Sequence, residues 1–216
     1  MLTEASKQAL TNLRDLSMVK WYVIPLLAIV FYIYTVEIKR ARETGNWNAV
    51  FAGATLFGMD LINEVWNALV LHFTQYSAVW TTPGDTAFRI LVGWNIEIAF
   101  MFSIAGIIFA HSLPDDKNVT ILGIPNRWVL AIGYSAFCVF VEILLNAGNH
   151  LVWAYAYWHA SFKGVWLIFL FGYFHFYIAS FLVHDMEKIA NKFKALAVIY
   201  GIGLPSFIIF IAMGWI

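Results

Sequence analysis

The sequence predicts an all-α membrane protein, a polytopic bundle of six transmembrane helices in one domain. The 216 residues are 62% hydrophobic and only 12% charged, about half the charged share of a soluble domain. This composition leaves too little polar surface to face water on all sides, so lipid must cover part of the chain. Lys plus Arg and Asp plus Glu both total 13. The charge balance therefore gives no indication of a nucleic-acid partner.

Residues 1–18 predict an amphipathic helix that lies on the membrane surface, ahead of a transmembrane domain over residues 19–216. The segment lacks a continuous apolar run, so it does not read as a cleavable signal peptide. Its small and apolar residues recur at helical spacing between charged ones, namely Leu2, Ala5, Ala9, Leu13 and Leu16.

Six segments are long and apolar enough to cross a bilayer core of about 30 Å, which takes about 20 residues of helix. They run approximately over Val19–Glu37, Asn48–His72, Thr86–His111, Arg127–Ala147, Phe162–Asp185 and Phe193–Ile216. Linkers that contain proline and glycine separate several of them. The aromatic stretch 149–161 is too short to span, so we expect it at the interface, with a seventh, re-entrant span there as the alternative.

The basic residues of the loops indicate the orientation. With six spans, five lie on the side of both termini: Lys7, Arg14, Lys20, Arg89 and Lys163. Eight lie on the other side: Lys39, Arg40, Arg42, Lys117, Arg127, Lys188, Lys192 and Lys194. Because basic loops stay in the cytoplasm, both termini are expected on the non-cytoplasmic side. The membrane is a bacterial or archaeal inner membrane, or the endoplasmic reticulum in a eukaryote.

The second span carries a polar face. Asp60, Asn63, Glu64 and Asn67 follow one another at positions i, i+3, i+4 and i+7. This spacing puts all four on one side of a helix. A charged side chain at the bilayer centre costs at least ~2.5 kcal/mol, so such a face normally turns toward the bundle interior and marks a functional site.

Further acids lie on the third and fourth spans. Glu97 follows Trp94 and Asn95, and Glu142 shares a helical face with Asn146 and His150. Because neighbouring spans are antiparallel, we expect all four acids in the same half of the membrane, in one pocket that opens toward the aromatic stretch. The predicted catalytic residues are Asp60, Glu64, Glu97 and Glu142. The predicted substrate-binding residues are Asn63, Trp66, Asn67, Trp94, Asn95, Asn146, His150 and His175.

The charge balance of this cluster limits its chemistry. Arg89 is the only basic residue of a span that could reach it, and four ionised carboxylates against one cation would be prohibitive in a low dielectric. Either some of the carboxyl groups hold protons, or a metal ion supplies positive charge. No cofactor is predicted, because the His and Glu spacings of membrane and bundle metal sites are missing. Iron or zinc would fit only on scattered ligands: Asp60, Glu64, Glu97, Glu142 and His150.

The favoured function is an intramembrane enzyme. A protonated acid donates a proton to a lipophilic substrate, and aromatic faces stabilise the cation that forms, as in isomerisation, cyclisation or hydration. The motifs Asn63-Glu64-Val65-Trp66-Asn67 and Trp94-Asn95-Ile96-Glu97 are similar to those of small integral-membrane terpene cyclases of meroterpenoid pathways and, more distantly, of emopamil-binding-type sterol isomerases. This resemblance implies an isoprenoid substrate and a catalytic role for Glu64 and Glu97. The order differs from the cyclase pattern, in which Trp immediately precedes Glu.

Three other functions remain open from the sequence. One is a metalloenzyme on the ligand set above, and another is a transporter in which the acids relay protons or ions. The third is a structural or pigment-binding subunit of a membrane complex. The expected partners are membrane lipids and a lipophilic small molecule, with association between copies of the chain left open.

Overall fold

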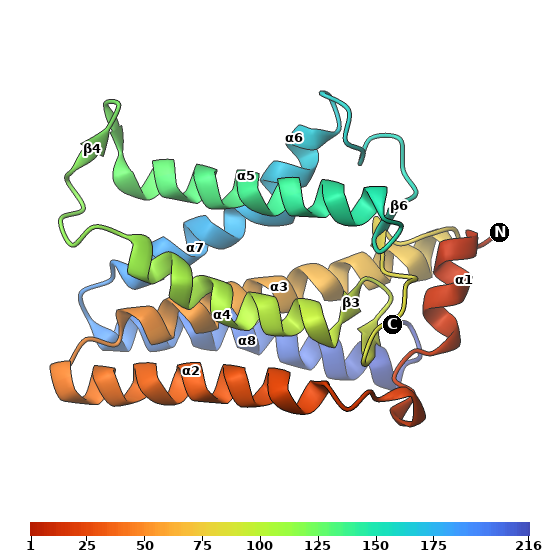
Figure 1. Cartoon of the computed structure of the whole chain (residues 1–216), viewed down its shortest axis with the longest axis horizontal. Coiled ribbons are helices and arrows are strands. Elements are labelled where there is room, and N and C mark those ends of the chain that lie inside the picture. Colours follow the sequence, from red (N-terminus) through yellow and green to blue (C-terminus); the bar gives the residue numbers. More distant parts are fainter.

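The computed structural model describes residues 1–216 and consists mainly of helices that pack side by side (Figure 1). The helices are α1 (Glu4–Thr11), α2 (Val23–Thr44), α3 (Asn48–Thr74), α4 (Ile96–Ser112), α5 (Asn126–Ala147), α6 (Val165–Leu167), α7 (His175–His184) and α8 (Ile189–Ala212). A 3₁₀ turn η1 (Leu16–Met18) precedes α2, and a π-helical segment η2 (Ile168–Phe174) joins α6 to α7. The mainly helical class predicted from the sequence is confirmed.

Short strand pairs hold the connecting loops, and all three are antiparallel. They are β1 (Trp80–Thr81) with β6 (Val152–Trp153), β2 (Arg89–Leu91) with β3 (Trp94–Asn95), and β4 (Thr120–Ile121) with β5 (Ile124–Pro125). The β1–β6 pair joins the loop after α3 to the loop after α5. Two segments about 70 residues apart in the sequence therefore meet at one end of the bundle.

Three helical stretches are long and apolar enough to cross a membrane: Asn126–Ala147, Val165–His184 and Ile189–Ala212. Helix α4 is apolar but has 17 residues. Helices α2 and α3 are longer, with 22 and 27 residues, but the C-terminal part of α2 is charged and α3 carries the polar face.

Helix α3 is the central element of the bundle and packs against α4, α7 and α8. It contacts α4 closely because small residues of the two helices meet there. A Cβ atom at Gly106 of α4 would lie 2.7 Å from the carbonyl oxygen of Ala52 and 2.8 Å from the Cα atom of Gly53. Backbone contact of this kind is open only to small residues.

The N-terminal helix is shorter than the predicted segment 1–18. It ends at Thr11, because the chain reverses at Arg14, which has a left-handed backbone (φ 56°). The Arg14 guanidinium donates to the carbonyl oxygens of Ile90 (3.1 Å) and Ile216 (2.9 Å). These contacts tie the N-terminal segment to the end of the bundle where both termini lie (Figure 1).

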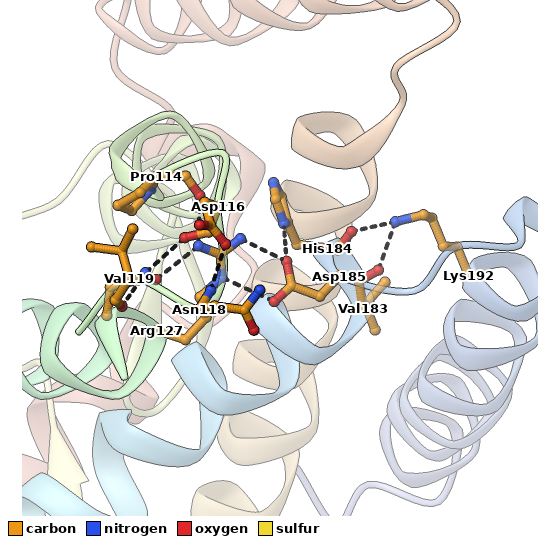
Figure 2. A network of polar contacts seen from close by, with 10 residues as sticks. Pro114, Asp116, Asn118, Val119, Arg127, Val183, His184, Asp185 and Lys192 are labelled. Atoms are coloured by element: carbon orange, nitrogen blue, oxygen red, sulfur yellow. Dashed lines mark hydrogen bonds and ion pairs between the residues drawn. The ribbon is translucent and has the colours of Figure 1, made fainter. Parts of the chain in front are cut away.

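The opposite end of the bundle is held by a polar network (Figure 2). The Arg127 guanidinium donates through Nε and Nη2 to the two carboxylate oxygens of Asp185, at 2.9 and 3.0 Å. Its Nη1 donates to the carbonyl oxygen of Pro114 at 2.6 Å, and Lys192 donates to the carbonyl oxygen of Val183 at 2.9 Å. The network therefore joins α5, α7 and α8 where each begins or ends.

The tight contact between α3 and α4 gives a first prediction. Gly106→Ala places a methyl group against backbone atoms, so we expect a loss of about 1–3 kcal/mol in the free energy of unfolding. Gly133→Ala is the matched control, since no atom lies within 4 Å of a Cβ atom there, and the better helix propensity of alanine leaves stability unchanged or slightly raised. Unfolding by SDS titration in detergent measures both. Equal stability of the two variants would contradict the packing.

The Arg127–Asp185 pair gives a second prediction. Asp185→Asn removes the bidentate acceptor of a guanidinium whose side chain is 6% exposed, so it destabilises the protein by about 1–3 kcal/mol, discounted because Asp185 is partly solvated. Asp115→Asn, on an exposed loop residue, is expected to be neutral. The same SDS titration compares them, and a neutral Asp185→Asn would show that the pair adds nothing to stability.

Candidate functional site

A pocket lies between α3, α4, α5 and the η2–α7 segment, and its empty space is about 660 Å³ when the part open to solvent is included. Most of its lining is apolar, including Phe102, Leu145 and Phe176. Three carboxyl groups interrupt the apolar lining, those of Asp60, Glu64 and Glu142, and each of these residues is at most 4% exposed. The structure thus brings three of the four predicted acids to one cavity.

Each of the three acids accepts a hydrogen bond from a tryptophan indole. Trp94 Nε1 donates to Asp60 Oδ2 at 2.9 Å, and Trp80 Nε1 donates to Glu64 Oε1 at 2.8 Å. Trp153 Nε1 donates to Glu142 Oε1 at 2.7 Å. These bonds fix the orientation of each carboxyl group without bringing a positive charge into the pocket.

Trp80 reaches Glu64 because Asn67 holds the backbone of the loop after α3. Asn67 Oδ1 accepts from the backbone N–H groups of Val79 (2.8 Å) and Trp80 (3.2 Å), and Asn67 Nδ2 donates to the Trp80 carbonyl oxygen at 2.8 Å. Asn67 is fully buried. Its amide thus satisfies backbone groups that would otherwise be unpaired inside the protein.

The stretch 149–161 is not helical and folds back onto the bundle end. Asn146 Nδ2 donates to the Leu151 carbonyl oxygen at 2.9 Å, and β6 pairs with β1. Trp158 is 3% exposed and stacks on Trp80, with ring centroids 5.5 Å apart. The aromatic stretch therefore forms one wall of the pocket.

Glu97 is a correction, because it lies outside this pocket. Helix α4 begins at Ile96 with Asn95 as its N-cap, so Glu97 sits in the first turn and not deeper along a span. It accepts from Tyr22 Oη and from the backbone N–H of Ala87, both at 2.8 Å, and from the Thr86 hydroxyl. Glu97 thus connects the N-terminal segment to the loop before α4.

Arg89 is also away from the three acids. Its guanidinium donates to the carbonyl oxygens of Gly84 (2.6 Å) and Ala9 (3.4 Å). The exposed Asp85 lies in the same loop as Arg89. The Lys20 ammonium, from the segment before α2, lowers the pKa of Asp85 through a direct hydrogen bond and through its charge. No Lys or Arg lines the pocket, so the predicted single nearby cation is absent from it.

Among the predicted substrate-binding residues, only Asn63 lines the pocket. Three of the others do not line the pocket but hydrogen-bond to its acids or to the loops around it, as described above: Asn67, Trp94 and Asn146. The remaining four lie elsewhere: Asn95 caps α4, Trp66 is 45% exposed beside Trp80, His150 is exposed near Gly84, and His175 faces the Leu170 carbonyl oxygen.

The fifth helical stretch turns a different face to the pocket from the one expected. The sequence favours His175 in the bundle interior, whereas the structure places Tyr173 and Gly172 in the pocket lining. Tyr177 and Ser180, which share a helical face with Tyr173, are buried as well (1% and 0% exposed), so this face and not that of His175 turns inward. Tyr173 itself lies in the π-helical segment η2, a conformation that is frequent at functional sites.

The scattered metal-ligand set is not assembled. Glu97 and His150 lie away from the other three acids, and no group of three or more His, Cys, Asp or Glu side chains is placed to hold a metal ion. The sequence reasoning missed Trp80 and did not assign Trp158 or Tyr173 to the site. The only available signal was the concentration of aromatic residues in loops at one end of the bundle.

The Asn67 clamp gives a third prediction. Asn67→Leu leaves two backbone N–H groups and one carbonyl buried without partners, so we expect a loss of about 2–4 kcal/mol in the free energy of unfolding. Asn191→Leu is the control, because Asn191 is exposed at the start of α8. Chemical unfolding in detergent compares the two variants. If both are equally stable, the amide does not hold the loop.

Comparison with known proteins gives the family. Residues 3–212 match a family described as "Uncharacterized membrane protein family". A protein of Archaeoglobus fulgidus, described as "Uncharacterized protein", is 50% identical over 202 residues, which cover 94% of this chain and 92% of that protein. No solved structure matches. The match over nearly its whole length shows that the chain belongs to this membrane protein family.

Proposed function

We propose that the protein is an intramembrane acid–base enzyme that acts on a lipophilic substrate. The observation that carries this proposal is the convergence of Asp60, Glu64 and Glu142 on one largely apolar pocket without a basic residue. Carboxyl groups are not needed to hold helices together, since amides and hydroxyls do so at lower cost. Buried carboxyl groups that line a cavity are typical of sites that transfer protons.

The proposed membrane arrangement has six crossings: α2, α3, α4, α5, the α6–α7 stretch and α8. Both termini lie at the same end of the bundle (Figure 1), which agrees with an even number of crossings. Helix α1 lies across that end, where an interfacial helix is expected. The count of basic residues favours the non-cytoplasmic side for this end.

The charges of the pocket favour at least one protonated acid. Three ionised carboxylates in a low-dielectric cavity would repel one another, and the indole N–H groups that contact them are neutral donors. Glu64 is the best candidate for the proton donor. Its Oε1 is occupied by Trp80, while its Oε2 has no hydrogen-bond partner in the protein.

The proposed reaction moves a double bond by two proton transfers. Glu64 donates the proton on Oε2 to one carbon of the substrate double bond, and a carbocation forms. The faces of Trp80, Trp158 and Tyr173, which line the pocket, stabilise this cation. A neighbouring carboxylate, Asp60 or Glu142, removes a proton from an adjacent carbon, and proton exchange among the acids restores the starting state.

Two exposed residues of the pocket lining indicate a sideways opening between α4 and α5, which supports a substrate dissolved in the bilayer. Met101 of α4 and Phe137 of α5 line the pocket and are 41% and 63% exposed. At 1.5 Å per residue, they lie about 8 and 15 Å from the nearer helix ends. The opening is therefore at membrane depth, where an isoprenoid or sterol-like molecule would enter.

Deuterium incorporation tests the proposed function. Vesicles in D₂O buffer contain the protein, a panel of isoprenoids and sterols, and a lipid extract of the producing cells. We expect deuterium bound to carbon in at least one lipid. We expect Glu64→Gln to lower the rate of incorporation by at least about 100-fold, since a general acid contributes about 10²–10⁴-fold. Mass spectrometry measures the incorporation.

Glu37→Gln is the matched control, because Glu37 is an acid of α2 that contacts His111 (2.8 Å) and does not line the pocket. We expect its rate to equal that of the unmodified protein. Incorporation that Glu64→Gln leaves unchanged, or none into any lipid, would contradict the proposal.

A further inference from the structure

Two residues of the pocket lining each have a buried polar atom with no hydrogen-bond partner in the protein. The atoms are Glu64 Oε2 and the indole Nε1 of Trp158, and both residues are 3% exposed. An unpaired buried polar group costs about 1–3 kcal/mol, and such groups are rare in native structures. A molecule that occupies the pocket and pairs with both atoms would remove that cost.

The two atoms belong to side chains that are fixed beside each other. Trp80 donates to Glu64 Oε1 at 2.8 Å, and the Trp158 ring stacks on the Trp80 ring at a centroid distance of 5.5 Å. Glu142, the other acid on this side of the pocket, accepts the indole N–H of Trp153. Glu64 and Trp158 thus line one pocket and are joined through Trp80, and we infer that the N–H of Trp158 and Oε2 of Glu64 face one ligand group.

We propose that these two atoms bind the single oxygen of a neutral lipid, such as an alcohol, ketone or aldehyde. Before the reaction, the Trp158 N–H and the protonated Oε2 of Glu64 both donate to this oxygen; in the proton transfer, Glu64 releases its proton to a double-bond carbon next to the oxygen-bearing carbon, and the Trp158 N–H keeps the oxygen in place. This inference rests on the proposed function, because it takes Glu64 as the protonated acid. A phosphate or carboxylate head group does not fit, since no basic residue lines the pocket and three acids would repel it.

The rest of the ligand is apolar. Besides the acids, the pocket is lined mostly by apolar residues, among them Phe102, Val141 and the exposed Phe137. A hydrocarbon chain held by its oxygen at the inner end can leave through the opening between α4 and α5 into the bilayer. The ligand class is therefore a long-chain lipid with one uncharged oxygen at its end.

A matched set of ligands tests the oxygen site. Farnesol, farnesene and farnesyl phosphate share one chain and differ in having a hydroxyl, no oxygen or a phosphate. Each competes with tritiated farnesol for the protein in nanodiscs, with concentrations expressed as mole fractions in the lipid. We expect farnesol to bind at least about 10-fold more tightly than the other two. Equal binding of farnesene would overturn the inference, because the two atoms would then bind only water, and tighter binding of farnesyl phosphate would overturn it as well.

Trp158→Phe removes the N–H donor and keeps an aromatic ring. We expect it to weaken farnesol binding by about 10-fold and to leave farnesene binding unchanged. Trp166→Phe is the control, since Trp166 is 52% exposed and does not line the pocket. Unchanged farnesol binding by a folded Trp158→Phe would overturn the role of the indole.

Glu64→Gln covers the case in which Trp158→Phe does not fold, and it separates the two proposals. Glutamine keeps an N–H donor but cannot give up a proton, so farnesol binding should stay within about 3-fold while deuterium incorporation is lost. A loss of the preference for farnesol over farnesene in this variant would overturn the inference. Deuterium incorporation by the unmodified protein without that preference would overturn the oxygen site alone, and the preference without incorporation would overturn the enzymatic proposal alone.

Discussion

The three pocket acids must be stabilised inside the bundle without a cation, and much of the local structure follows from this constraint. A basic residue would form an ion pair and favour the ionised carboxylate. An indole N–H gives a directed hydrogen bond and no charge. Trp94, Trp80 and Trp153 provide these bonds at 2.7–2.9 Å, and all three come from strands in loops, so the loops must fold back onto the helices.

Two sites in the bundle illustrate the difference between a structural and a reactive acid. At one end, both oxygens of Asp185 are occupied by Arg127 (Figure 2), and the pair serves to join helices. In the pocket, one oxygen of Glu64 is held by an indole and the other is unpaired. An acid that is oriented but not neutralised can exchange a proton with a bound molecule, which supports the proposed chemistry.

The errors of sequence reasoning have specific causes. Glu97 was expected beside the other acids because the apolar run around it looks like a span from Thr86 onward. The N-cap at Asn95 starts the helix later and leaves Glu97 in its first turn, bonded to loop groups. The cost of an imidazole that faces lipid favours His175 over Tyr173 as the inward residue, whereas the structure buries the opposite face of this stretch, with Tyr173 in the pocket lining and Tyr177 and Ser180 behind it.

The sequence by itself determined the helical membrane class and the acids of two helices. The composition has too few charged residues for a surface that faces water on all sides, so lipid must cover part of it. The 3.6-residue period of the helix puts Asp60 and Glu64 on one face of α3, whatever that helix packs against. Tertiary structure alone decided which donors meet those acids. Trp80 and Trp158 are 78 residues apart, and they stack because β1 pairs with β6 and because Asn67 holds the loop. Such contacts depend on the three-dimensional closure of distant loops, which no local periodicity encodes.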